Sequence, residues 1–364
     1  MVHVASRNLL RAGNAFAGLP VRYWQAPLSF HRPEKTFEPT LTLAHILYNV
    51  GFASMPDIAL RITAWRNIYA LARPDVLLAD YSPTALLAAR GGAMRTVSMG
   101  IGFCVPPNQR PLPAFAILTK AASPQQLVND EAGVVANINT ALQQHKLPLI
   151  TALADVFHAM PNAWLATVPE LDHYPGRGPA EYWGLSPEKP GNVATWPAGT
   201  RRRVFAYLKP FPVLDSLLEL LNKLELPSII ACDGLSPELR SRHVSNTMAF
   251  APPNVDLGQM NRECHLAITN GNHTTTARFL LAGKPVLTVP LHLEQELISC
   301  AVRAHGLGVS VRRTEPRDVY AQVAELLNSP SYSKAAAAFA AKYSGCYENR
   351  LARMVDSVER LTGN

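Results

Sequence analysis

A short run of small and polar residues, TNGNHTTT at 269–276, carries groups suited to binding an anion. A strand predicted at 265–269 leads into a loop containing Gly271, and a helix is predicted to begin within Thr274–Thr276. A helix start exposes backbone N–H groups without intrahelical partners and carries about half a positive charge. The threonine hydroxyls and His273 add donors, and a glycine lets a ligand approach the backbone closely. The run is typical of a phosphate-binding loop.

A second polar pair, Glu294 and Gln295, follows the next predicted strand, PVLTVP at 285–290. In open α/β sheets, an acidic residue about twenty residues beyond a phosphate loop accepts hydrogen bonds from ribose hydroxyls. Together the two signals indicate a nucleotide site. Each alone also has a structural explanation, because a Thr-rich helix start can be ordinary capping and the helix dipole favours an acid in a first turn.

These residues need a framework of alternating strands and helices, which the sequence predicts in both halves of the chain. The strands predicted are 2–5, 21–24, 74–80 and 96–103 in the first half, and 203–208, 227–232, 247–251, 265–269, 285–290 and 308–312 in the second. Strands that are apolar throughout, such as PDVLLAD at 74–80, are typical of a parallel sheet covered on both faces. The fold class is therefore α/β with two Rossmann-like domains, and a cleft between the domains is the expected ligand site.

A segment rich in Pro, Gly, Trp and Tyr divides the two series of strands and predicts a linker at 169–200. The predicted N-terminal domain is then 1–168 and the predicted C-terminal domain is 201–333. A helical tail is predicted at 334–364.

The charge of the chain says little about partners. Lys and Arg exceed Asp and Glu by 34 − 27 = 7, but the tight basic run is confined to Arg201–Arg203, beside loop sequence. Nucleic acid is therefore not an expected partner, whereas a mild attraction to anionic small molecules fits. The apolar runs stop well short of the roughly 20 residues that span a bilayer. No transmembrane segment is predicted, and peripheral association with a membrane stays open.

The five cysteines stand singly in the sequence, without a CxxC pair. Cys264 and His265 lack a second ligand pair at zinc spacing, so no metal site is predicted. Scattered, odd-numbered cysteines fit reduced thiols, and the start of the chain lacks the pattern of an export signal. A cytoplasmic location is predicted.

The segment 265–308 resembles the nucleotide-sugar site of the UDP-glycosyltransferase-like (family 1, macrolide-type) glycosyltransferases. Their pattern is a strand, an HxGGxxT-like loop, a helix, GxPxxxxP, an acid–Gln pair, and a helix ending in G-x-G. This chain has TNGNHTTT, AGKPVLTVP, Glu294–Gln295 and HGLG, and the similarity runs over nearly its whole length. The resemblance implies the GT-B fold, two facing Rossmann-like domains. It further implies that the N-terminal domain binds the acceptor and the C-terminal domain binds the nucleotide sugar.

The resemblance also implies roles for individual residues. The diphosphate would lie against a loop and helix start made of Gly271, Asn272, His273, Thr274, Thr275 and Thr276. Glu294 and Gln295 would contact ribose or sugar hydroxyls. Lys209 would follow a strand at the domain interface and meet the leaving diphosphate, although a solvated lysine before Pro210 explains it equally well. The UDP- or dTDP-sugar would be a co-substrate, and no cofactor is implied.

This chain departs from the family pattern in its binding loop. Asn270 and Asn272 stand where the family often has His and Gly, and Ala277 stands near a position that is often acidic. Such differences bear on the choice of sugar or on the strength of binding.

A larger departure concerns the N-terminal domain, which resembles the family from its second strand onward and is predicted to be incomplete. In the family, the loop after the first strand supplies the histidine that removes the proton of the acceptor hydroxyl. His3 lies within a strand, so this role is not assigned to it. Asp80, at the end of the strand 74–80, is the predicted base or partner of a base, with helix capping as the alternative. Other candidates are weaker: His31, His45 and Asp172–His173.

The resemblance therefore predicts an inverting, hexosyltransferase-type enzyme with a small or lipid-like hydroxyl acceptor. No DxD motif occupies a suitable loop, which favours a metal-independent mechanism. Gly100 and Gly102 could line the acceptor pocket, or could serve a tight turn after a strand. The alternative function is a nucleotide-sugar-binding protein without transferase activity, and a related epimerase comes last, because the residues it needs are not identified.

Overall fold

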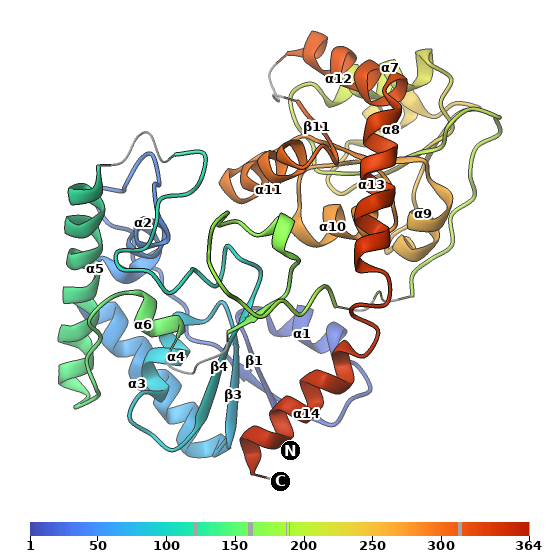
Figure 1. Cartoon of the computed structure of the whole chain (residues 1–364). Coiled ribbons are helices and arrows are strands. Elements are labelled where there is room, and N and C mark those ends of the chain that lie inside the picture. The colour runs from blue at the N-terminus through green and yellow to red at the C-terminus, as the bar shows by residue number, and fades with distance from the viewer. Residues whose placement is uncertain (119–122, 159–162, 187, 189, 312–314, 364) are drawn as a thin grey trace. The chain divides into compact units, whose positions relative to one another are not determined.

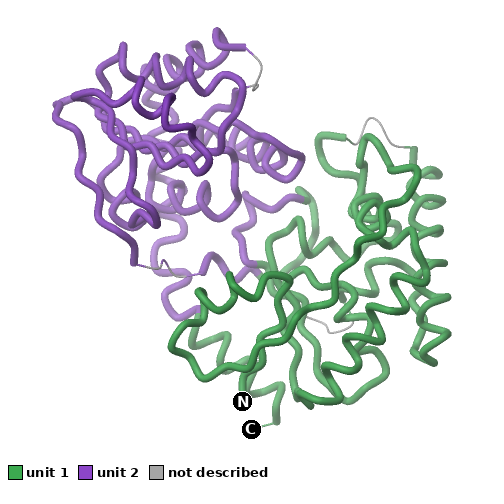
Figure 2. Tube along the Cα trace, turned by 180° about the vertical axis from the view of Figure 1, so that it is seen from behind, with its two compact units in different colours: residues 1–165, 174–181, 351–364 green, residues 166–173, 182–350 purple. Residues whose placement is uncertain are grey.

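The computed structural model describes residues 1–118, 123–158, 163–186, 188, 190–311 and 315–363 (Figure 1). The chain divides into two compact units, drawn in green and purple in Figure 2. Unit 1 comprises Met1–Leu165, Tyr174–Glu181 and Leu351–Asn364, and unit 2 comprises Ala166–His173 and Tyr182–Arg350.

This division differs from the predicted boundaries at the linker and the tail. The predicted linker 169–200 is shared between the units, because its aromatic side chains are buried: Tyr174 packs in unit 1 and Trp183 is buried in unit 2. The predicted tail is divided as well. Helix α13 (Pro330–Tyr343) packs in unit 2, whereas α14 (Arg350–Thr362) lies almost entirely in unit 1.

Unit 2 is built on a six-stranded sheet with the order β11-β10-β9-β6-β7-β8. All of its strand pairs are parallel. The strands are β6 (Val204–Leu208), β7 (Ser228–Cys232), β8 (Met248–Phe250), β9 (Leu266–Thr269), β10 (Val286–Thr288) and β11 (Gly308–Ser310). The order reverses between β6 and β9, and the crevice outside the carboxyl ends at such a point is the usual ligand site of open α/β sheets.

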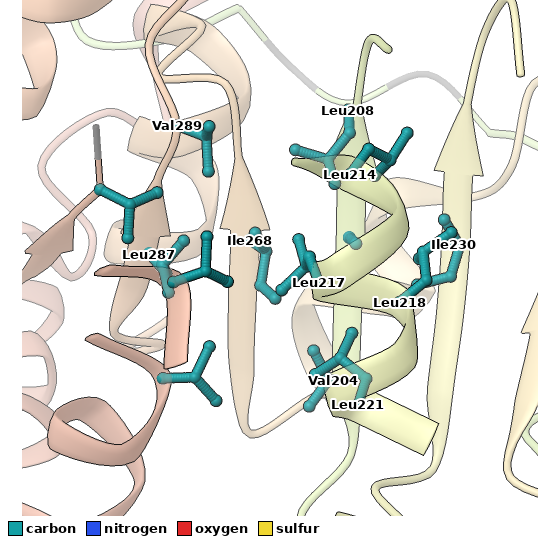
Figure 3. Packing of buried hydrophobic residues seen from close by; sticks show 14 of the residues in the cluster. Val204, Leu208, Leu214, Leu217, Leu218, Leu221, Ile230, Ile268, Leu287 and Val289 are labelled. Carbon is teal, nitrogen blue, oxygen red and sulfur yellow. The ribbon is translucent and has the colours of Figure 1, made fainter. Parts of the chain in front are cut away.

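Helices cover both faces of this sheet, as the continuous apolar strands predict. They are α7 (Leu214–Lys223), α8 (Pro237–His243), α9 (Leu257–Glu263), α10 (His273–Leu281), α11 (Leu293–Ala304), α12 (Pro316–Asn328) and α13. The leucines of α7 pack on β6, β7 and β9 (Figure 3). Along β6, Val204 and Ala206 belong to this cluster, whereas Phe205 belongs to the cluster on the other face.

Unit 1 holds two separate parallel sheets. β1 (Val2–Ser6) pairs with β2 (Val21–Gln25), and a second sheet has the order β3-β4-β5. Its strands are β3 (Val76–Asp80), β4 (Arg95–Gly100) and β5 (Trp164–Leu165). The helices are α1 (Leu9–Ala15), α2 (Leu43–Leu47), α3 (Met55–Ala72), α4 (Pro83–Ala89), α5 (Pro124–Gln144) and α6 (Ala154–Phe157), with α14 added from the far end of the chain. A short π-helical turn, η1 (Tyr48–Phe52), follows α2. That this domain lacks one strand stays a prediction.

Within the part of the chain that the structure describes, no helix is both long enough and apolar enough to span a bilayer.

Asn270 links three strands of unit 2 at the point where the strand order reverses. Its Oδ1 accepts a hydrogen bond from the backbone N–H of Lys209, just after β6, at 2.6 Å. Its Nδ2 donates to the carbonyl oxygen of Val289, just after β10, at 2.9 Å. Asn270 itself follows β9 and is fully buried. The side chain thus fixes the loop that leads into α10.

We expect Asn270→Ala to lower the free energy of unfolding of the chain by about 1–3 kcal/mol, because backbone groups that it satisfies would lose their partner. Urea unfolding followed by circular dichroism measures this loss. The matched control is Asn272→Ala, two residues further on, since the Asn272 side chain makes no capping hydrogen bond with α10. Equal stability of both variants would contradict the role given to Asn270.

Candidate nucleotide site in unit 2

A cavity of about 770 Å³ opens at the carboxyl ends of β6, β7 and β8. The strand ends contribute Tyr207, Ala231 and Cys232, and the loops after β7 and β8 contribute 233–235 and 251–255. The first turn of α10 adds Thr274 and Thr275. The remaining lining residues are Ser186, Pro190, Gly191, Arg240, Leu257 and Arg278. This volume lies within the usual range of small-molecule sites, about 300–1,000 Å³.

Helix α10 contributes two residues of its first turn to this cavity, Thr274 and Thr275. It begins at His273, earlier than predicted, with Asn272 as its N-cap. The helix's first intrahelical bond runs from the Thr276 N–H to the Asn272 carbonyl at 2.9 Å, so the N–H groups of 273–275 precede it. Thr274 and Thr275, the next two residues, line the cavity. The cavity wall is therefore polarised by the positive end of a nine-residue helix.

The structure gives Thr276 a different role from the predicted contact with a diphosphate. Its N–H is used within the helix, and its buried hydroxyl lies 2.9 Å from the Thr269 hydroxyl. The predicted contact of a diphosphate with the Thr276 amide therefore does not fit this structure. The residue instead secures the helix start to the end of β9.

His273 also differs from its predicted role as a diphosphate ligand. It is 3% exposed, and its Nε2 lies 2.6 Å from the Thr167 hydroxyl. Burial, assisted by the neighbouring His173 ring, lowers the pKa of His273 from its ordinary value of 6.5 to about 3. The ring is therefore neutral near pH 7 and contributes no positive charge to an anion site.

Gly271 is required by packing rather than by a ligand. Its φ is +81°, and a Cβ there would lie 2.7 Å from the Gln295 carbonyl oxygen and 3.0 Å from the Ser299 hydroxyl. The close approach predicted for this glycine is therefore made by α11, against which the loop packs. A side chain at this position would push the start of α10 away from α11.

Glu294 and Gln295 do not line the cavity in the described structure. The Gln295 side chain is buried, and its Oε1 accepts a hydrogen bond from the Leu291 N–H at 2.8 Å, which closes the turn before α11. Glu294 places its Oε1 3.4 Å from His173 Nε2. Gln295 is thus occupied locally, and a contact of Glu294 with ribose or sugar stays a prediction.

Lys209 lies beside this site without lining the cavity. Its Nζ is 2.9 Å from Asp233 Oδ2, and Asp233 is a cavity residue. The hydrogen bond to Asp233 raises the pKa of Lys209, so the amine stays charged. Both side chains are exposed, and an ion pair of this kind contributes little stability.

The prediction missed most of the cavity. It followed one loop, whereas the loops after β7 and β8 end at the same edge of the sheet and supply residues 232–235 and 251–255.

The sequence could have indicated Arg278 as a cavity residue. It lies three and four positions after the two cavity threonines and so shares their helix face. Its Nη2 donates to the Ser186 carbonyl at 3.1 Å. Arg240 stacks over the Phe250 ring, 5.0 Å from its centroid.

In unit 1 the structure brings Asp80 and Gly100 together. Asp80 ends β3 and Gly100 ends β4, and a Cβ on Gly100 would lie 3.2 Å from Asp80 Oδ1. Asp80 is exposed, yet partial desolvation raises the pKa of its carboxyl. The carbonyl of Gly102 accepts a hydrogen bond from Arg177 Nη2 at 3.3 Å, which ties the loop after β4 to the segment 174–181.

Two of the other predicted bases, His45 and Asp172, are held by structural contacts. His45 is buried, with the Leu41 N–H donating to its Nδ1 at 3.1 Å and its Nε2 lying 2.9 Å from Asp130 Oδ2. Asp172 accepts a hydrogen bond from the Tyr182 hydroxyl at 2.9 Å. Neither nitrogen of His45 is left to remove a proton.

Comparison with known proteins defines the fold. The chain matches no model of a protein family. The glycotransferase of kitacinnamycin superposes with a TM-score of 0.69 at 16% identity, over 99% of this chain and 91% of that one. Glycosyltransferase VinC in complex with dTDP also gives 0.69, at 15% identity, over 100% and 92%. SsfS6 of Streptomyces sp. SF2575, complexed with thymidine diphosphate, gives 0.63 at 17% identity, over 94% and 87%. The predicted α/β class and GT-B fold, that of macrolide-type glycosyltransferases, are confirmed.

One curated protein is similar in sequence over part of the chain. It is the zeaxanthin glucosyltransferase of Pseudescherichia vulneris, 32% identical over 105 residues. The match covers 28% of this chain and 24% of that protein, so the chain matches about a quarter of its relative's length.

The lowered pKa of His273 predicts a pH dependence of stability. Between pH 6.5 and about 3 the unfolded chain binds a proton at this site and the folded chain does not, so the free energy of unfolding falls as the pH falls. The slope from one such group is at most about 1.4 kcal/mol per pH unit. Urea unfolding from pH 7.5 to 5 should show a shallower slope for His273→Gln than for the natural chain.

The control for this experiment is His305→Gln, at an exposed histidine of the same unit, which should keep the natural slope. If His273→Gln also keeps it, His273 is not the buried neutral histidine described here.

Proposed function

We propose that the chain is a glycosyltransferase that binds a UDP- or dTDP-sugar in the unit 2 cavity and transfers the sugar to a hydroxyl acceptor. The observation that carries the proposal is the first turn of α10. Its N–H groups precede the first helical bond, and Thr274 and Thr275 line a cavity large enough for a nucleotide.

The diphosphate is assigned to the N-terminus of α10. The amides of 273–275 and the hydroxyls of Thr274 and Thr275 offer donors there, and the helix dipole favours negative charge. Arg240 and Arg278 line the same cavity. Arg278 Nη1 lies 3.8 Å from Glu188 Oε1, and the lining acid Asp233 pairs with Lys209, so Arg240 is the side-chain cation that we assign to the diphosphate. Support comes from the similar structures of VinC and SsfS6, which were solved with dTDP and thymidine diphosphate.

The reaction we propose is a single displacement with inversion. The acceptor oxygen forms a bond to the anomeric carbon while the bond from that carbon to the diphosphate oxygen breaks, and the electron pair leaves with the diphosphate. The helix N-terminus offsets the charge that develops on the leaving group, which is why we propose that no metal is needed. The proton of the hydroxyl passes to a base, and Asp80 is our candidate because desolvation raises its pKa.

The second candidate is a protein that binds a nucleotide sugar without transferring it. The observation in its favour is that both nitrogens of His45, one of the predicted bases, are engaged in structural contacts. Whether the acceptor is a small or a lipid-like alcohol is also left to experiment.

We expect Thr274→Glu to weaken binding of UDP and dTDP at least about tenfold, a loss of about 1.4 kcal/mol. A carboxylate in the first turn of α10 would repel the diphosphate while remaining favourable for the helix itself, so folding should be preserved. Isothermal titration calorimetry measures the affinity and a thermal melt checks the fold. The matched control is Gln126→Glu, the same charge change in the first turn of α5 in unit 1. Equal affinity of both variants would place the diphosphate elsewhere.

We expect Asp80→Asn to lower kcat about 100-fold or more while nucleotide affinity stays unchanged, because the amide cannot take the proton. Turnover of a UDP- or dTDP-sugar with a panel of hydroxyl acceptors provides the measurement. Asp75→Asn, just before β3 in the same unit, is the matched control. Activity of Asp80→Asn within twofold of the control would remove Asp80 as the base, and a natural chain that binds the sugar nucleotide without turnover would favour the second candidate.

A further inference from the structure

A buried histidine holds the carboxylate of Glu294 from one side. His173 ends the short segment Ala166–His173 of unit 2, and its Nε2 lies 3.4 Å from Oε1 of Glu294, in the first turn of α11. A protonated imidazole, or a neutral one with its proton on Nε2, donates to a carboxylate at this atom. Oε2 of Glu294 has no hydrogen-bond partner within the described residues. One oxygen of this carboxylate is therefore anchored and the other is left to accept.

The ring of His173 is itself fixed by its neighbours. Its side chain is 0% exposed, and it lies against the ring of His273, the first residue of α10, with the two centroids 5.7 Å apart. His273 Nε2 in turn lies 2.6 Å from the hydroxyl of Thr167, at the other end of the same segment. The segment 166–173 thus contacts the first turns of both α10 and α11. The position of His173 is set by packing and does not depend on a ligand.

The order of the strands places Glu294 beyond α10 when viewed from the cavity. The cavity lies at the carboxyl ends of β6, β7 and β8, whereas α10 follows β9 and α11 follows β10. In the sheet, β9 lies between β6 and β10. The loop at Gly271, which leads into α10, packs directly against Gln295 of α11. A ligand that runs from the cavity across the first turn of α10 therefore reaches the first turn of α11 next.

A nucleotide sugar has the same linear order, with the diphosphate between the nucleoside and the sugar. In the proposed function the nucleoside lies in the cavity and the diphosphate at the start of α10. The ribose then lies on the cavity side of the diphosphate, and the sugar lies on the side of α11. A hydroxyl of the sugar is therefore the donor that can reach Glu294.

We propose that His173 is a positioning residue for the donor sugar: it fixes one carboxylate oxygen of Glu294 so that the other accepts a hydrogen bond from a sugar hydroxyl. This inference rests on the proposed function, since it takes the diphosphate to lie at α10. A glutamate side chain loses rotamer freedom when it binds a ligand, and a buried partner removes that freedom beforehand. His173 thus supports binding of sugar nucleotides and is indifferent to nucleoside diphosphates that lack a sugar.

The experiment compares these two kinds of ligand in the full chain. Isothermal titration calorimetry measures the affinities for UDP and dTDP and for four sugar nucleotides: UDP-glucose, UDP-galactose, dTDP-glucose and dTDP-rhamnose. In His173→Gln the amide nitrogen takes the place of Nε2, whereas His173→Leu fills similar space without a donor. The matched control is His243→Leu, because His243 is a second buried histidine of unit 2 that pairs with a carboxylate, that of Asp215, at 2.5 Å. Thermal melts check the fold of each variant.

We expect His173→Leu to weaken binding of the sugar nucleotides at least tenfold and binding of UDP and dTDP less than threefold, because the nucleoside and diphosphate do not reach Glu294. His173→Gln should remain within threefold of the natural chain for every ligand. The double variant His173→Leu/Glu294→Gln should bind sugar nucleotides no more weakly than Glu294→Gln alone, since the histidine then has no carboxylate to place. His243→Leu should leave the ratio of the two affinities unchanged.

An equal loss for both kinds of ligand in His173→Leu would overturn the proposal, because His173 would then merely support the fold. No loss for either kind, or the same loss in His173→Gln as in His173→Leu, would overturn it too. So would a natural chain that binds UDP or dTDP but none of the four sugar nucleotides. These outcomes leave the nucleotide site standing, whereas a natural chain that binds none of the six ligands would contradict the proposed function itself and this inference with it.

Discussion

The start of α10 depends on a small set of contacts that hold it against the carboxyl ends of β6, β9 and β10. Asn270 joins the chain after β6 to the chain after β10, and Gly271 lets the loop approach α11. Thr276 binds the Thr269 hydroxyl from within the helix. Because these contacts fix where α10 begins, they also fix the direction in which its first-turn amides point. The proposed binding of an anion in the cavity rests on that placement.

Charge at this site comes from the backbone and from arginine rather than from histidine. His273 is neutral because burial disfavours its protonated form. Its position in the sequence beside the threonines therefore does not indicate a charged ligand for the diphosphate. The Lys209–Asp233 pair is exposed and largely neutralises itself. Arg278 lies 3.8 Å from Glu188, which offsets its charge, so the helix dipole and Arg240 are the sources of positive potential in the proposed diphosphate site.

Much of the fold was predictable because parallel strands buried on both faces are written as continuous apolar runs. The TNGNHTTT run likewise predicted a helix start at the carboxyl end of β9. The burial of His273 was not predictable, since its partner Thr167 comes from a distant part of the chain. Gln295 appeared available to a ligand because nothing in the sequence shows that it caps the Leu291 N–H. The cavity loops after β7 and β8 carry no phosphate-binding motif, so only the sheet order reveals them. The predicted linker resembled loop sequence, yet it is divided between the units, and its Tyr174 and Trp183 side chains are buried.

The most direct test of this account is a crystal structure of the full chain with bound thymidine diphosphate. The account predicts phosphate oxygens within hydrogen-bonding distance of the backbone nitrogens of 273–275, with the nucleoside inside the cavity bounded by the loops after β7 and β8. Clear density for the nucleotide at another place on unit 2, with these amides bound only by water, would contradict it.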